Sequence, residues 1–283
     1  MIYIGCHLSI SNGYEAMGEK MSSLGGNTFA FFTRNPRGGK SKAIDPEDAK
    51  KLCKYLTEQK FGPLVAHAPY TMNLCSDNDR AREYAEECFS EDLKKMEYFP
   101  GNYFNFHPGN YLKQEKEQCM DHIAEIMNRY ITEEIHTTVL LETMAGKGTE
   151  IGRTFEELQY ILSRLNPIAL DNTGICLDTC HIWDGGYDIA EHLDQVLEQF
   201  DQTIGLKRIM AVHLNNSLNC CGEHKDRHAK LSEGEIGLKA LRKIVRHPML
   251  QNKPFILETP NDEEGYRKEI AQIKEWMFDE TKD

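Results

Sequence analysis

Short apolar runs alternate with segments of helical period along the whole chain. Between the runs, apolar residues recur at the spacing of one helix face, as at Ala49, Leu52, Cys53 and Leu56. Alternation of this kind is typical of a parallel sheet covered by helices. The runs predict eight strands, at Tyr3–Cys6, Thr28–Phe32, Pro63–Ala66, Tyr103–Phe106, Thr138–Leu141, Gly174–Leu177, Arg208–Val212 and Pro254–Leu257.

Two helix starts are marked by their residues. Asp45 followed by Pro46 provides an N-cap and a proline at the first helical position, and Thr154 with Glu157 has the spacing of a capping box. Eight β-α units without a linker or a break in composition predict one closed α/β barrel of the TIM type, a single domain over residues 1–283. The alternative, an open doubly wound sheet, usually carries a G-x-G-x-x-G turn, which this sequence lacks.

Composition narrows the possible partners and the compartment. A formal charge of −12 argues against a simple basic nucleic-acid binder, so an anionic partner would need a local positive patch or metal ions. Nine scattered cysteines without a C-x-x-C pair indicate buried thiols in a reducing cytosol. The chain starts without the positive region of a signal peptide, and no apolar run approaches the roughly 18 residues of a membrane span. We therefore expect a cytoplasmic protein with no membrane partner.

Six consecutive predicted strands end on a residue type that binds metals. In barrels of this class the chemistry lies at these strand ends. One such histidine often only hydrogen-bonds a loop, and one such carboxylate often caps a helix. Six together would repel or stay unsatisfied without cations between them, so the pattern favours a metal centre. The six residues are His67, His107, Glu142, Asp178, His213 and Glu258.

The mixture of imidazole nitrogen and carboxylate oxygen favours Zn²⁺, with Mn²⁺ or Fe²⁺ as possible substitutes. Asp226 and His228 share a face if the chain is extended, so the pair can bind one ion. Asp178 and His181 are an odd number of residues apart and would point to opposite sides if the strand continued. That spacing favours two neighbouring ions.

Eight ordered motifs resemble the endonuclease IV family of apurinic/apyrimidinic endonucleases. The resemblance runs from GCHLS near residue 5 to ILETP near residue 258, which is nearly the whole chain. The motifs are HAPY (67–70), NFHPGN (105–110), LLETMAGKG (140–148), CLDTCHIWDGGYD (176–188), HLNNS (213–217), HKDRH (224–228), EGEIG (233–237) and ILETP (256–260).

The resemblance implies a TIM-type barrel with three zinc ions. Its reaction hydrolyses the phosphodiester 5′ to an abasic site in double-stranded DNA, leaving a 3′-hydroxyl and a 5′-deoxyribose phosphate, with possible 3′-phosphodiesterase activity. Glu258 and the bridging Glu142 are the expected catalytic residues, and Glu258 would orient or deprotonate the nucleophile. The implied ligand sets are His67, His107 and Glu142; Glu142, Asp178, His213 and Glu258; and His181, Asp226 and His228.

The segment 32–42 carries four cations and no acid. It is either a solvated basic loop or the local patch that an acidic protein needs to approach phosphates. The resemblance implies that Arg37 enters the minor groove and that Tyr70 helps to fill the gap left by the extruded abasic nucleotide. Arg227 is a further expected DNA contact, with Lys225 beside it. Trp183 is expected to pack rather than to read a base.

The sequence departs from the family pattern at Asn216, where aspartate is usual, and at 231–232, where Leu-Ser replaces Ile-Gly. These departures affect the loop near the third ion. We expect His7 to hydrogen-bond a metal ligand and Cys180 to be a buried thiol.

Two other classes of protein remain as alternatives. A metal-dependent sugar isomerase or epimerase uses the same barrel, but it would need a catalytic Lys or paired Glu and has no use for the triplet 226–228 or the basic loop. A silent damage-binding protein would be expected to lack some ligands. We expect a monomer.

Overall fold

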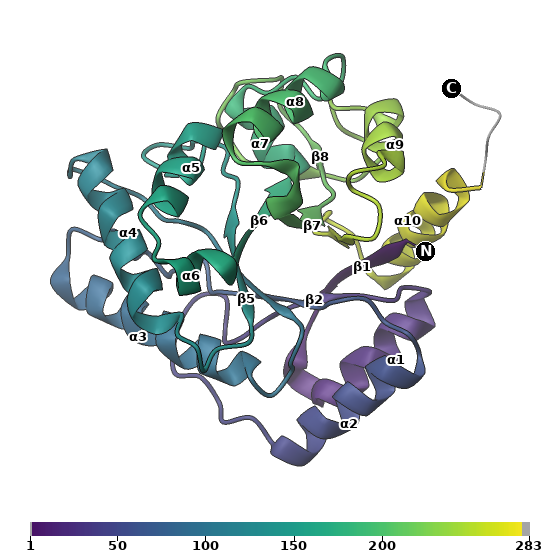
Figure 1. Ribbon diagram of the computed structural model, residues 1–283. Helices are drawn as coiled ribbons and strands as arrows, with labels where there is room; N and C mark the ends of the chain where they lie inside the picture. Colours follow the sequence, from purple (N-terminus) through teal and green to yellow (C-terminus); the bar gives the residue numbers. More distant parts are fainter. Residues whose placement is uncertain (1, 279–283) are drawn as a thin grey trace.

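The eight strands close into a parallel barrel surrounded by helices (Figure 1). The structure is a computed structural model that describes residues 2–278, so Met1 and residues 279–283 of the expected 1–283 domain lie outside the described residues. Neighbouring strands follow the order β1-β10-β7-β6-β5-β4-β3-β2, and β1 pairs with both β10 and β2. The closed barrel confirms the predicted fold and excludes the open sheet. The barrel strands are β1 Tyr3–Leu8, β2 Ala30–Phe32, β3 Val65–His67, β4 Tyr103–Phe106, β5 Thr138–Glu142, β6 Thr173–Asp178, β7 Ile209–His213 and β10 Pro254–Leu257.

Ten α-helices and two short 3₁₀ helices, Ile10–Asn12 and Leu206–Arg208, are described, most of them around the barrel. A short two-stranded sheet, β8 (Asn216–Ser217) and β9 (His228–Ala229), lies outside it. Within the described chain, none of the helices has the length and apolar character needed to span a membrane. The helices are α1 Tyr14–Leu24, α2 Pro46–Glu58, α3 Asp79–Met96, α4 Lys116–Tyr130, α5 Phe155–Ser163, α6 Pro167–Asp171, α7 Thr179–Gly185, α8 Leu193–Thr203, α9 Leu238–Arg246 and α10 Glu263–Trp276.

The helix starts follow the sequence closely, with one difference. Asp45 accepts a hydrogen bond from the backbone of Glu47 at the start of α2, as predicted. Thr154 caps α5 by accepting from Glu157 N at 3.3 Å. The reciprocal half of the predicted capping box is not formed, because the Glu157 carboxylate accepts instead from the backbone of Gly152 and Arg153.

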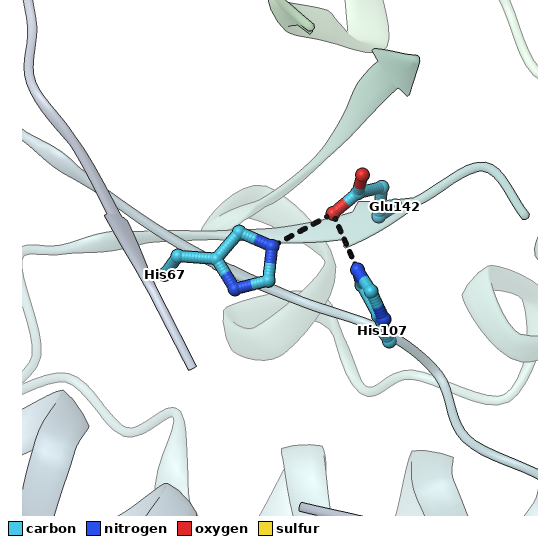
Figure 2. A group of neighbouring side chains, drawn as sticks. All are labelled: His67, His107 and Glu142. Atoms are coloured by element: carbon cyan, nitrogen blue, oxygen red, sulfur yellow. Dashed lines mark hydrogen bonds and ion pairs between the residues drawn. The ribbon is translucent and has the colours of Figure 1, made fainter. Parts of the chain in front are cut away.

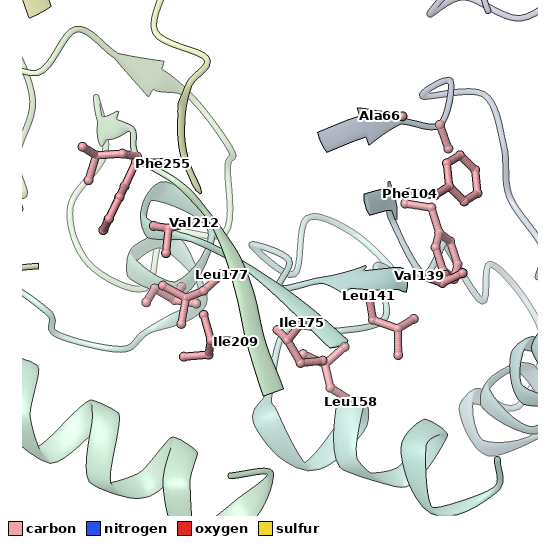
Figure 3. Close-up of a cluster of buried hydrophobic side chains, with 14 of the residues drawn as sticks. Ala66, Phe104, Val139, Leu141, Leu158, Ile175, Leu177, Ile209, Val212 and Phe255 are labelled. Atoms are coloured by element: carbon pink, nitrogen blue, oxygen red, sulfur yellow. The ribbon is translucent and has the colours of Figure 1, made fainter. Parts of the chain in front are cut away.

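The strands separate two apolar layers, because successive side chains point to opposite sides. Outward side chains such as Leu141 and Ile175 pack with helix residues such as Leu158 of α5 (Figure 3). Inward side chains form a small inner cluster that fills the barrel, as in other TIM barrels. Its members are Ala30, Val65, Leu140, Cys176, Ala211 and Ile256.

Candidate metal centre

The residues predicted from the strand ends lie together at one end of the barrel. Glu142 follows the inner-cluster residue Leu140 by two positions, and His213 follows Ala211 in the same way. A step of two keeps a side chain on the same side of a strand. These polar groups therefore continue the inner layer to the end of the barrel where the strands finish, which we call the mouth. The same step relates Val65 to His67, Cys176 to Asp178 and Ile256 to Glu258.

Glu142 is the residue that the imidazoles share. Its Oε2 lies 3.1 Å from His67 Nε2 and 3.3 Å from His107 Nε2 (Figure 2). Its Oε1 lies 3.0 Å from His213 Nδ1 and 3.4 Å from His181 Nδ1. The side chain is fully buried. One carboxylate therefore connects histidines from four different parts of the chain.

A second group of potential donor atoms includes Glu142 again. One donor atom from each of Glu142, Asp178, His213 and Glu258 lies within 4.8 Å of the others. His213 Nδ1 is 3.2 Å from a Glu258 oxygen and 3.8 Å from an Asp178 oxygen. His213 Nε2 is buried and has no hydrogen-bond partner. Glu142 therefore belongs to both groups of potential ligands.

The residues of the third predicted set, His181, Asp226 and His228, lie close together, but they also belong to groups that include Asp178 or Cys180. Asp226 Oδ1 lies 3.2 Å from His181 Nε2 and 3.5 Å from His228 Nε2. Asp178, His181 and His228 form one compact group, and Cys180, Asp226 and His228 form another. Burial raises the pKa of the Cys180 thiol, so it stays neutral and is a poorer ligand than the carboxylate.

The argument from the spacing of Asp178 and His181 was wrong. The strand does not continue past Asp178; α7 begins at Thr179, and Asp178 caps it by accepting from His181 N at 2.8 Å. The helical turn brings the two side chains towards the same side. The spacing therefore gives no information on the number of ions.

Asp226 is held by a buried carboxylate that the sequence did not single out. Asp226 has a left-handed backbone (φ 54°), and its N–H donates to Asp184 at 2.7 Å. Asp184 also accepts from Ser217 Oγ at 2.7 Å and Asn219 Nδ2 at 2.9 Å. Asp184 thus fixes the loop that presents Asp226, and only its place in the CLDTCHIWDGGYD motif could have indicated this.

Two asparagines orient the carboxylates, and both were overlooked. Asn215 donates to Asp178 Oδ2 at 2.8 Å and accepts from Glu258 N at 2.9 Å. Asn105 donates to Glu142 Oε2 at 2.5 Å. Both amides are completely buried. Hydrogen bonds of this kind fix the direction of metal ligands.

The charges in the mouth stabilise one another. Burial opposes ionisation of Glu142 and Glu258, but the nearby His213 outweighs it and the pKa of each carboxyl falls well below its usual range. Burial likewise lowers the pKa of His181, but Asp178 and its other carboxylate neighbours raise it well above the usual value. Glu142 and Glu258 are thus anionic, and His181 holds a proton that a cation would have to displace.

The donor set fits transition-metal cations. The mouth combines carboxylate oxygens with imidazole nitrogens, which is the mixture that zinc binds well. His228 Nε2 faces Asp178 and Asp226 at 3.7 Å and 3.5 Å and is buried without a hydrogen-bond partner, an arrangement that is costly unless another group satisfies it. These observations support metal binding and leave the identity and number of ions to be proposed below.

His7 differs from its expected role. Its Nε2 approaches a Glu258 oxygen at 3.5 Å but forms no hydrogen bond there. The ring is stacked on Phe32 with centroids 4.4 Å apart. Burial lowers the pKa of His7 to about 4, so it is neutral at physiological pH. His7 therefore acts mainly as a packing partner beside Glu258.

Tyr70 stands at the rim of the mouth. Its side chain is 60% exposed, although its ring lies 5.8 Å from His67 and 5.9 Å from His107 between centroids. The backbone N–H of Tyr70 donates to Pro36 O at 3.0 Å and so ties this rim to the basic segment 32–42. The predicted contact with DNA is compatible with this exposed position and stays a prediction.

The basic segment 32–42 exposes fewer positively charged side chains than the sequence suggested. Arg34 is buried and forms a two-pronged pair with Asp92, at 2.8 Å and 2.7 Å, so it is not part of a phosphate-binding patch. Arg37, Lys40 and Lys42 are exposed. A cavity of about 900 Å³ extends from Glu258 and Tyr70 to the two lysines. The positive patch therefore adjoins the mouth without the buried arginine.

On the opposite loop, Arg227 is exposed, whereas Lys225 is paired with Glu223 at 2.7 Å. Trp183 is buried and donates to Asn219 O at 2.8 Å, so it packs as predicted.

The two departures from the family pattern contact each other. The Asn216 amide donates to Leu231 O at 2.8 Å and accepts from Ile236 N at 3.0 Å. An ionised aspartate can accept but cannot donate. The asparagine therefore suits the local path of this loop.

The fold and the site together define a xylose isomerase-like TIM barrel with a metal-binding mouth. The family model of that description matches residues 19–276. A protein from Clostridium beijerinckii called probable endonuclease 4 is 54% identical over 97% of this chain and 98% of its own length. One of the same name from Akkermansia muciniphila is 49% identical over 97% and 99%. The chain belongs to the endonuclease IV family and is an enzyme of that family.

Solved structures give the same result. Endonuclease IV from Thermus thermophilus superposes with a TM-score of 0.85 at 30% identity, covering 98% of this chain and 99% of that one. A D-tagatose 3-epimerase-like protein superposes with a TM-score of 0.71 at 20% identity, covering 97% of each chain, a likeness that shows the fold alone. The relatives' sequences, not the shared barrel, decide against the isomerase alternative.

Proposed function

We propose that the protein hydrolyses the phosphodiester on the 5′ side of abasic sites in double-stranded DNA. The products would be a 3′-hydroxyl and a 5′-deoxyribose phosphate. Family membership supports endonuclease activity. The observation that carries the proposal is the buried group around Glu142, where carboxylates and imidazoles converge in the mouth of the barrel.

We propose three zinc ions per chain, with Mn²⁺ or Fe²⁺ as substitutes. Zinc in such a site supplies Lewis acidity, which favours ionised water near neutral pH and offsets negative charge on the phosphate. Glu142 would serve two of the ions. The ligand sets would be His67, His107 and Glu142; Glu142, Asp178, His213 and Glu258; and His181, Asp226 and His228.

Glu258 is proposed to orient the attacking water and accept its proton. It lines the cavity of about 900 Å³ and keeps an ionised carboxylate, because His213 lowers its pKa despite burial. Attack on phosphorus opposite the 3′-oxygen breaks the P–O3′ bond, and the departing 3′-oxygen takes up a proton. Glu142 contacts four histidines, and its proposed part is to hold the two ligand sets in register.

Arg37, Tyr70 and Arg227 are proposed to bind the DNA. All three are exposed. Tyr70 combines an apolar ring with a position beside His67, so it can fill the space of a missing base while the abasic sugar enters the mouth. Arg37 and Arg227 would contact the groove and the phosphates. A 3′-phosphodiesterase activity would use the same phosphate chemistry at a strand end.

We further propose that residues 1–283 act as one domain, as a monomer, in the cytoplasm. A chain that spans nearly the full length of its relatives supports the first point.

The test is cleavage of a duplex that contains one tetrahydrofuran abasic analogue, by protein loaded with zinc. We expect one cut on the 5′ side of the lesion, a 3′ end that a polymerase extends, and no cut in the matched undamaged duplex. Ketose epimerisation measured in the same preparation is the control for the rival class. Ketose conversion without DNA cleavage would reject the proposal.

A further inference from the structure

Two cysteines line a pocket outside the metal centre. Cys75 lies in the loop between β3 and α3, and Cys119 lies near the start of α4. Both are nearly buried, at 2% and 3% exposure. They line a pocket of about 330 Å³ together with Arg82 and Gln114. The pocket has room for several water-sized molecules, so a small reagent can reach thiols that a protein partner cannot.

The two cysteines are in contact although they are 44 positions apart in sequence. Cys75 Sγ is 3.4 Å from Cys119 O, and the two thiols also share a hydrogen bond. Gln114 Nε2 donates to Cys75 O at 2.6 Å, which holds the loop against the start of α4. The two thiols are therefore neighbours, as a disulfide between them requires.

The surroundings make the two thiols unequal. The hydrogen bond from Cys75 lowers the pKa of Cys119, and Arg82 lowers it further, although burial opposes both. Cys119 is also the fourth residue of α4, where the positive end of the helix favours a thiolate. The same hydrogen bond and burial raise the pKa of Cys75. Cys119 is thus the thiol that attacks first, and Cys75 is the thiol that reacts second.

We propose that Cys75 and Cys119 are a peroxide-reactive pair that closes to a reversible disulfide. The Cys119 thiolate attacks one oxygen of hydrogen peroxide, the O–O bond breaks, and the departing hydroxide becomes water. Cys75 then attacks the sulfenic sulfur of Cys119: the S–S bond forms, the S–O bond breaks, and a second water leaves with the Cys75 proton. Two thiols are oxidised, and one peroxide is reduced to two waters.

The disulfide would join the loop 68–78 to α4. Asn73 of that loop already donates to Asn110 O at 3.1 Å and accepts from Asn110 N at 3.0 Å. Tyr70 lies on the same loop. Oxidation would therefore restrain the rim of the mouth while leaving the metal-binding side chains in place.

The test is peptide mapping of the full-length, metal-loaded protein under non-reducing conditions after stoichiometric hydrogen peroxide. We expect a peptide linking Cys75 to Cys119, the loss of two thiols, recovery with dithiothreitol, and slower hydrogen exchange in residues 68–78. Cys53 is partly exposed and serves as the internal reference for unselective oxidation. Cys220→Ser/Cys221→Ser is the matched control and should form the same linked peptide.

Substitution separates the two roles. In Cys75→Ser, dimedone should trap a sulfenic acid at Cys119. In Cys119→Ser, oxidation of Cys75 should slow by at least about 10-fold. Oxidation of Cys53 before either residue, or no linked peptide once the thiols are consumed, overturns the proposal. The mapping of the unsubstituted protein decides the question even if a variant fails to fold, and it does not depend on DNA cleavage.

Discussion

Glu142 and Glu258 are both ionised carboxylates among imidazoles, but they differ in how far solvent can reach them. Glu142 is completely buried and contacts four histidines, so its oxygens have no room for a substrate. The Glu258 side chain keeps 12% of its surface exposed and lines the large cavity at the mouth. Of the two carboxylates, Glu258 is the one that solvent can reach, in keeping with the role in orienting water proposed for it.

Replacement of Glu258 by glutamine tests this role. Glu258→Gln keeps the shape but removes the negative charge, so single-turnover cleavage of abasic duplex should fall by about 100-fold or more. Affinity for the same duplex should change little. Glu275→Gln, at an exposed position on α10, is the control and should cleave normally. Turnover near that of the parent protein in Glu258→Gln would remove the residue from the mechanism.

Arg37 and Arg34 belong to one segment but should behave in opposite ways. Arg37→Ala should weaken binding of abasic duplex and reduce the slope of log affinity against log salt by about 1, because one exposed cation is lost. Arg34→Ala should instead lower the free energy of unfolding by about 3 kcal/mol, since it removes the buried guanidinium from the pair with Asp92 and leaves that carboxylate with only Thr33 and Lys95. Binding isotherms at several salt concentrations and urea unfolding measure the two effects. If Arg37→Ala discriminates between abasic and intact duplex as well as the parent protein does, the segment is only a solvated turn.

At the scale of elements, the strands were readable from the sequence and the loops were not. Alternation within each strand places Glu142 two positions beyond the buried Leu140, so the inward face and its polar end follow from the pattern alone. The pairing of Arg34 with Asp92 joins residues 58 apart and leaves no local signal. The switch from strand to helix after Asp178 was missed because the side chain of that residue both faces the mouth and caps α7.

Asp184 links α7 to the loop that carries Asp226. Asp184→Asn removes the negative charge that accepts from the Asp226 backbone N–H and the Asn219 amide, and it turns an N–H₂ group towards Ser217 Oγ, so the hydrogen bonds that hold Asp226 lose their charge assistance. We expect affinity for one bound metal to fall by about 10–100-fold while the other sites stay filled. Metal analysis after dialysis measures this, with Asp188→Asn as the control in the same region. Full metal retention in Asp184→Asn would mean that the loop holds its position without the carboxylate.

Glu97, just after α3, fixes the start of β5. Burial opposes its ionisation, but hydrogen bonds from Thr137 and His136 outweigh it and lower the pKa of Glu97. A lowered pKa stabilises the fold above the unfolded-state pKa, and this contribution is lost as the pH falls through the folded-state pKa. Glu97→Gln should thus cost about 1 kcal/mol at pH 7 and less near pH 3.5.

Urea unfolding at the two pH values measures this difference. The neighbouring Glu134→Gln, at an exposed position, is the control and should change stability little at either pH. An equal cost for Glu97→Gln at both pH values would show that the charge of Glu97 contributes nothing.

For the whole molecule, metal and protons compete for the same mouth. Elemental analysis of gently purified protein should find about three transition-metal ions per chain, and a chelator should abolish cleavage and lower the melting temperature. Nearby carboxylates raise the pKa of His107 and His181 above the ordinary value of 6.5 despite burial, and Cys176 together with Glu258 and Glu142 does the same for His213. Neutral imidazoles bind metal, so the bound metal should be released as the pH falls and these imidazoles take up protons. One ion per chain with full activity would contradict the three-ion proposal.

The order of the strands along the chain also determines the stage of folding at which the metal centre is complete. Its polar side chains come from strands spread between His67 and Glu258, and Glu142 in the middle contacts partners on both sides in sequence. Glu258 arrives only when β10 pairs with β1 and β7, the step that closes the barrel. A partly folded or nascent chain therefore presents histidines without the carboxylate that completes the centre. If Glu258 has the role proposed for it, such a chain could collect stray metal without cutting DNA, and the topology itself would delay nuclease activity until folding is finished.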